Sequence, residues 1–107
     1  MRSIASSGTN IAALWYVRKK QLRGVTLNFV KQEIALYSNP QTGCFEHGLP
    51  FLAKLCDLKE NMMRVHLRAL RDEGVIEVIR LPASKPGQAY NHYRIIGLKE
   101  HLNSPAS

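Results

Sequence analysis

The chain has 107 residues and carries 15 Lys and Arg against 8 Asp and Glu, which gives a formal net charge of +7. This length allows one domain with one modest core, and an apolar fraction of 45% excludes wholesale disorder. The positive surplus favours a polyanionic partner, either nucleic acid or an anionic membrane surface, although a basic surface without a partner stays open as an alternative.

The cysteines and the ends of the chain bear on its location. Cys44 and Cys56 are too few to frame a small secreted fold, and we interpret them as reduced thiols in the cytoplasm. Residues 1–8 lack the apolar run of a signal peptide, and we expect them to form a flexible N-terminus. No stretch approaches the ~20 apolar residues of a membrane span. We therefore expect a cytoplasmic protein without a membrane partner.

Apolar residues at helical spacing predict a helix over residues 11–23, capped by Thr9 or Asn10 and ended by Gly24. An isolated helix would leave these residues in water, so we expect segment 9–24 to support a homodimer. The alternative is that the helix folds back and fills a groove on its own domain. Membrane association is disfavoured because Arg18 interrupts the apolar arc. The apolar residues are Ile11, Leu14, Trp15 and Leu22.

A second helix is expected to be capped by Thr26 and to end before Pro40, because proline does not continue a helix. Its residues at steps of three and four form a stripe that can be buried. That stripe consists of Leu27, Val30, Ile34 and Tyr37. Cys44 and Phe45 are then expected to form a short strand.

The most informative segment follows and reads FLAKLCDLKENMMRVHLRALRDEGVI from Phe51 to Ile76. It predicts a short helix over Leu49–Cys56 with Pro50 in its first turn, and a longer helix over Lys59–Glu73. Two helices separated by so few residues must pack against each other at a tight turn.

The turn itself has the residues that such a helix pair needs. Ala53 is small enough for the point where the helices cross, and Leu58 can plug the gap between them. Asp57 tolerates the positive φ that the turn requires.

Two β-type segments come last. Val75–Leu81 and Ala89–Ile96 predict a hairpin around the loop Pro82–Gln88, because the first is rich in Val and Ile and the loop holds two prolines and a glycine. We expect Leu98–Ser107 to be a short tail, and we place the folded domain at residues 25–97.

This order of elements resembles the winged helix-turn-helix family. The resemblance implies an α+β fold, with a helical bundle, a C-terminal β-wing of two or three strands and here an extra N-terminal helix, that binds double-stranded DNA. It covers roughly residues 26–96. The matching positions are Leu52-Ala53 in the supporting helix, Leu58 in the turn, Met63, Leu67 and Leu70 on the buried face of the recognition helix, and Gly74-Val75-Ile76 before the wing.

Two further stretches narrow the resemblance. Asn39–Phe45 and Tyr90–Ile95 are similar to segments of helix-turn-helix domains in phage and plasmid replication proteins. The chain departs from that pattern at Glu46-His47, where Pro-Ser is usual, and at Lys59, where a capping Ser is usual. The resemblance implies a transcriptional regulator or a replication-initiation or mobile-element control protein.

One face of the expected recognition helix has the residue types that read base edges. Arg can pair with guanine, Asn with adenine, and Val can contact a thymine methyl group. The alternative is a solvated face with ion pairs such as Arg68 with Asp72. The base-reading residues are Asn61, Arg64, Val65 and Arg68, and the further expected DNA contacts are Lys59, Met62, Arg80 and Lys85.

We expect no catalytic residue, cofactor or metal, and no small-molecule ligand is evident. Cys44, His47 and His66 are too scattered for a zinc site, and no phosphate loop or paired-carboxylate motif occurs. The chain is therefore not expected to be an enzyme. The alternative function is a winged-helix protein–protein interaction module without direct base readout.

Overall fold

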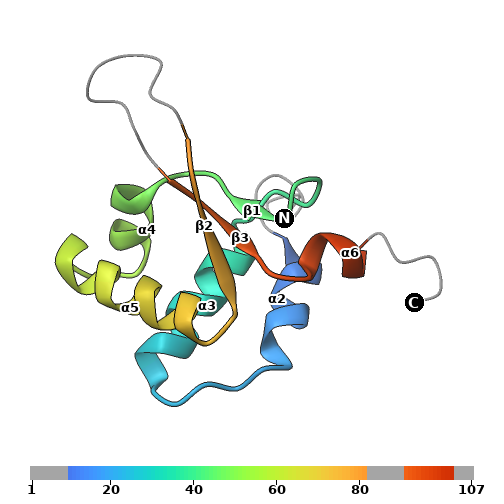
Figure 1. Cartoon of the computed structure of the whole chain (residues 1–107). Helices are drawn as coiled ribbons and strands as arrows, with labels where there is room; N and C mark the ends of the chain where they lie inside the picture. Colours follow the sequence, from blue (N-terminus) through green and yellow to red (C-terminus); the bar gives the residue numbers. More distant parts are fainter. Residues whose placement is uncertain (1–9, 82–90, 103–107) are drawn as a thin grey trace, which may run out of the picture.

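The computed structural model describes residues 10–81 and 91–102. Within these residues the chain forms an α+β fold of five helices and one three-stranded antiparallel sheet (Figure 1). The elements are α2 (Ile11–Arg18), α3 (Val25–Leu36), β1 (Cys44–Phe45), α4 (Leu49–Leu55), α5 (Glu60–Asp72), β2 (Ile76–Arg80), β3 (Asn91–Ile95) and α6 (Leu98–Leu102).

The sheet has the order β1-β3-β2, so the last strand lies in the middle. The β2–β3 ladder runs from the pair Ile76 and Ile95 to the pair Arg80 and Asn91, and β1 adds Phe45 opposite Tyr93. The two predicted strands therefore pair as expected, and the short strand at Cys44–Phe45 is confirmed. The predicted loop Pro82–Gln88 and the start of the predicted strand Ala89–Ile96 lie outside the described residues.

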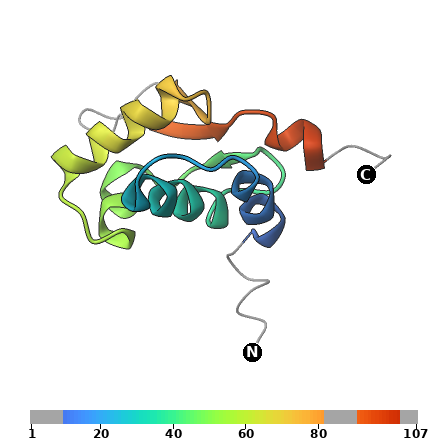
Figure 2. The same cartoon turned by 90° about the horizontal axis from the view of Figure 1, so that it is seen from below.

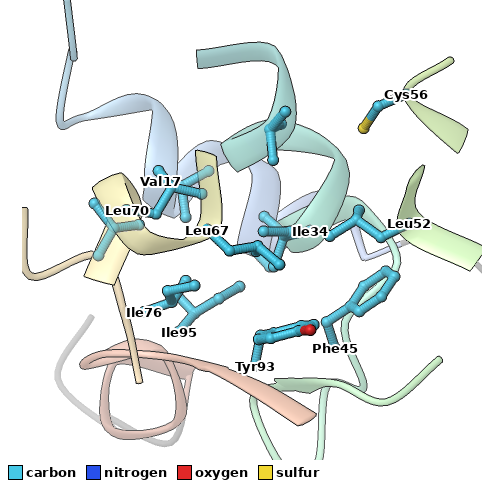
Figure 3. Packing of buried hydrophobic residues seen from close by; sticks show 14 of the residues in the cluster. Val17, Ile34, Phe45, Leu52, Cys56, Leu67, Leu70, Ile76, Tyr93 and Ile95 are labelled. Carbon is cyan, nitrogen blue, oxygen red and sulfur yellow. The ribbon is translucent and has the colours of Figure 1, made fainter. Parts of the chain in front are cut away.

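One core joins the helices to the sheet. Figure 2 shows β3 along one side of the molecule and α2 and α3 along the other. Between them lie apolar side chains from nearly every element (Figure 3). The large buried apolar side chains include Val30 and Ile34 of α3, Phe45 of β1, Leu52 of α4, Met63 and Leu70 of α5, Ile76 and Ile95 of the sheet, and Leu98 of α6.

The first helix is shorter than the sequence predicts. α2 ends at Arg18, whereas its apolar spacing predicts a helix to residue 23. The Asn28 carboxamide makes hydrogen bonds with the Leu22 backbone in place of helical ones. Its Oδ1 accepts from the Leu22 amide at 3.1 Å, and its Nδ2 donates to the Leu22 carbonyl at 2.6 Å. Leu22 then packs against the core from a loop. A side-chain contact from the next helix, six residues along the chain, thus overrides the helical spacing.

α2 packs against its own domain. Ala13 and Val17 are buried in the shared core. The helix is capped by Asn10, as predicted, because Asn10 Oδ1 accepts from the Ala13 amide at 3.1 Å. Asn10 Nδ2 also donates to Ser38 Oγ at 3.2 Å, which ties the start of α2 to the end of α3. Trp15 remains 59% exposed, so homodimerisation through this helix stays a prediction.

Two other predictions need correction. α3 begins at Val25, with Gly24 at φ 99° before it and no side-chain cap, so Thr26 lies inside the helix and does not cap it. The predicted tail at Leu98–Ser107 instead begins with helix α6, because Leu98 is fully buried in the core. Tyr16 lies near this helix, with its ring 4.9 Å from that of His101.

Val17→Ala tests whether α2 belongs to the core of its own chain. We expect the free energy of unfolding to fall by about 2 kcal/mol, because two buried carbons are lost and a cavity remains. Val25→Ala, at a position of α3 that is 88% exposed, is the matched control, with an expected change within about 0.5 kcal/mol. Urea denaturation measures both. Equal effects, or a Val17→Ala effect that varies with protein concentration, would contradict the packing described above.

Candidate nucleic-acid interface

α4 and α5 form a helix pair around a tight turn. The turn holds Asp57 at φ 55°, the single non-glycine residue with positive φ in the part of the chain that the structure describes. The Leu58 amide donates to the Ala53 carbonyl at 2.9 Å, and the Leu58 side chain packs against the core. These are the roles predicted for Asp57 and Leu58. The two helices also begin and end within one residue of the predicted positions.

α5 has one buried face and one exposed face. Met63, Leu67 and Leu70 are buried in the core, as predicted. The residues expected to read bases lie in solvent, and Val65 is 58% exposed although its side chain is apolar. The exposed residues are Asn61, Met62, Arg64, Val65 and Arg68. The helical spacing alone therefore identified both faces correctly.

A groove of about 590 Å³ runs between α5 and the β2–β3 pair. Its walls carry guanidinium groups from both elements, and Leu67, Val78 and Tyr93 provide apolar surface within it. The arginines that line it are Arg64, Arg68, Arg71 and Arg80. Arg64, Arg68 and Arg80 were expected to contact DNA from the sequence, and the structure brings them to one groove.

Arg71 was missed by the sequence reasoning. It follows Arg64 by seven residues, which is about two helical turns, so both lie on the same side of α5. That spacing was a usable signal, but the strand that completes the groove is known only from the fold. Arg71 pairs with Asp72 at 3.7 Å, and both side chains are more than half exposed. Such a pair adds little stability and leaves the guanidinium able to exchange partners.

Arg64 is held in place by its own helix. Its Nη1 donates to Asn61 Oδ1 at 3.0 Å, and its Nη2 lies 3.8 Å from Glu60 Oε1. These groups are exposed, so a phosphate can displace them at small cost. The alternative interpretation of this face expected an ion pair between Arg68 and Asp72. Among the described residues Asp72 instead pairs with Arg71. The Arg68 charge therefore has no carboxylate partner there.

The remaining predicted contacts lie at the edges of this surface. Lys59 is the exposed residue just before α5, and it makes no side-chain cap. Met62 is exposed on the side of α5 away from the groove, since it does not line it. Arg80 is the last residue of β2. Lys85 lies outside the described residues.

Burial shifts the pKa values of one tyrosine at this surface and of both cysteines elsewhere in the fold. Burial raises the pKa of the Tyr93 hydroxyl, and the nearby Arg64 charge opposes that rise in part. Burial also raises the pKa of the Cys44 thiol, and it raises that of Cys56 to about 11. Both thiols are thus protonated at neutral pH. Within residues 10–81 and 91–102, no group of three or more His, Cys, Asp or Glu could hold a metal ion.

Comparison with protein-family models, curated proteins and solved structures found no match for this chain. Among the helices that the structure describes, none has the length and apolar character needed to cross a membrane. The functional interpretation therefore rests on the geometry and charge of the α4–α5 pair and its groove.

Proposed function

We propose that this protein binds double-stranded DNA as a winged helix-turn-helix domain, with α5 as the recognition helix and the β2–β3 hairpin as the wing. The observation that carries the proposal is the alignment of Arg64, Arg68, Arg71 and Arg80 along one groove beside the exposed face of α5. The net charge of +7 supports it. The family resemblance favours a role in transcriptional regulation or in replication initiation of a mobile element.

Arginine suits the proposed ligand for a geometric reason. Its planar guanidinium can donate two parallel hydrogen bonds to a phosphate, and it stays charged at every physiological pH. Four such groups along a groove match the spaced negative charges of a DNA strand. Among the residues that the structure describes, Glu60 is the single carboxylate that lines this groove, so the described groove carries a net positive charge.

The surface divides into two parts. In helix-turn-helix proteins the N-terminal part of the second helix contacts base edges. In α5 that part holds Asn61, Arg64 and Val65, and Arg68 follows Arg64 by one turn on the same exposed face, so these four are the proposed base readers. Arg71 in the last turn and Arg80 at the end of β2 are the proposed phosphate contacts, because they are farther from the start of α5.

Exposed apolar side chains on α4 and α5 favour a second candidate function, a protein–protein interaction module. Phe51, Met62 and Val65 are 41%, 49% and 58% exposed, and they lie on the same helix pair. A winged-helix protein-interaction module would use such residues as its contact surface. It would have no need of four arginines around a groove, which is why DNA binding is the first proposal. Failure to bind duplex DNA would favour this module.

DNA binding is expected to depend strongly on salt. Each neutralised phosphate contributes a slope of about −0.9 in log affinity against log salt, so four arginine contacts should weaken binding by about two decades between about 50 and 200 mM salt. Fluorescence anisotropy with a random duplex measures this. Arg71→Ala should reduce the slope by about 1, and Lys99→Ala on α6 is the matched control. Affinity that is insensitive to salt would rule out the phosphate contacts.

Substituting a proposed base reader should change DNA affinity differently from substituting a proposed phosphate contact. The comparison uses a preferred site, obtained by selecting bound sequences from a random duplex pool. Arg64→Ala or Arg68→Ala should cost about 1–3 kcal/mol on that site and bring its affinity closer to that of random DNA. Arg80→Ala should weaken both duplexes equally. If all three substitutions behave alike, the division into readers and positioning residues is wrong.

A homodimer remains part of the proposal, with a narrower interface than the sequence predicts. Ile11 and Trp15 are exposed on α2, and the Arg18 guanidinium lies 4.7 Å from the Trp15 ring centroid. A two-fold dimer would place two recognition helices on successive turns of a palindromic site. We expect sedimentation to show a dimer at micromolar concentration that Trp15→Ala converts to a monomer. Phe29→Ala, on the exposed part of α3, is the control, and a monomeric intact protein would exclude the dimer.

A further inference from the structure

A second pocket, of about 420 Å³, lies where the end of α2, the middle of α3 and the start of β2 meet. Its apolar wall includes Val17, Val75 and Ile96, and its polar wall consists of Lys19, Lys20 and Lys31. None of the described residues that line it is acidic. The volume falls in the range of about 300–1,000 Å³ that is usual for small-molecule sites.

Lys31 is the unusual residue in this wall. It lies within α3 and is only 1% exposed, which is rare for a lysine without an ionic partner. Its Nζ donates to the Lys20 carbonyl. No Asp or Glu among the described residues lies within ion-pairing distance of it. An ammonium group has three hydrogens to donate, so this single bond leaves most of its capacity unused.

The surroundings of Lys31 make its charge costly. Burial lowers the pKa of the Lys31 ammonium, and the positive charge of Lys20 lowers it further. An anion beside Lys31 would offset both effects, because it restores an ionic partner and screens one lysine from the other. An anion in this pocket would therefore lie beside a buried ammonium that has no carboxylate partner among the described residues.

We propose that this pocket binds a small monocarboxylic acid, with the carboxylate on Lys31 and an aliphatic body against Val17, Val75 and Ile96. The mostly apolar wall favours a ligand with a hydrocarbon part over inorganic phosphate, whose hydration shell the wall cannot replace. The carboxylate supplies the single charge that Lys31 lacks. This inference does not rest on DNA binding by α5.

Two hydrogen bonds shape the rim of the pocket. Lys20 Nζ donates to the carbonyl of Glu73 at the end of α5, and the Tyr16 hydroxyl donates to the Ile96 carbonyl at 2.9 Å. They tie the α2–α3 region to both the end of α5 and the end of β3. The apolar walls are thus held apart by bonds that a ligand does not have to break.

Octanoate is the probe, with octanol, octylamine and inorganic phosphate as comparisons, and isothermal titration calorimetry on the full chain measures binding. We expect octanoate to bind about tenfold or more tighter than octanol, which is the worth of one charge-assisted hydrogen bond. Octylamine and phosphate should bind more weakly still. Equal affinity for octanoate and octanol, or preference for phosphate, would overturn the proposal.

Lys31→Met is the decisive variant because it keeps the length of the side chain and removes the charge. It should abolish the advantage of octanoate over octanol, whereas Lys54→Met, an exposed lysine on α4, should leave it unchanged. Ile96→Trp is the second variant, for use if Lys31→Met does not fold. Its larger side chain fills the pocket from a partly exposed position and should abolish binding of both octanoate and octanol. Undiminished octanoate binding in either folded variant would refute the assigned site.

Discussion

Burial of one face of α5 between α3 and the sheet is the constraint on which the rest of the molecule depends. Met63, Leu67 and Leu70 leave water together only when the helix lies across the core. Each large apolar side chain contributes about 1.5–3 kcal/mol on burial, so this orientation is strongly preferred. The opposite face is then necessarily exposed. Its charged and polar residues, which would be costly inside, become available to a partner in solution.

The two lysine- and arginine-rich sites of this chain differ in their electrostatics. The groove beside α5 is open, so its guanidinium groups keep their hydration and pair loosely with Glu60 and Asp72. Lys31, in contrast, is almost completely buried and donates to the Lys20 carbonyl. An open, multiply charged groove suits a long polyanion. A smaller, mostly apolar pocket with one buried lysine in its wall suits a small ligand that has a hydrocarbon part and a single charge.

The local parts of the fold were predictable because local residues decide them. Pro50 in the first turn of α4, the positive φ at Asp57 and the buried stripe of α5 each follow from the chemistry of one residue or from spacing along one helix. The pairing of β2 with β3 agrees with the predicted hairpin for a similar reason, since consecutive strands in a short chain pair readily. The exposed face of α5 could be identified by the same reasoning.

What the sequence by itself determined was therefore the set of helices and strands around the α4–α5 turn and which face of α5 is apolar. Only the tertiary structure decided where α2 ends, because Asn28 binds the backbone of Leu22 from another element. It alone made Leu98 a core residue and added Arg71 to the groove with Arg80. Contacts of a side chain with another element leave no periodic trace, even where the two residues are only six apart, as Leu22 and Asn28 are, so no periodic pattern could reveal them.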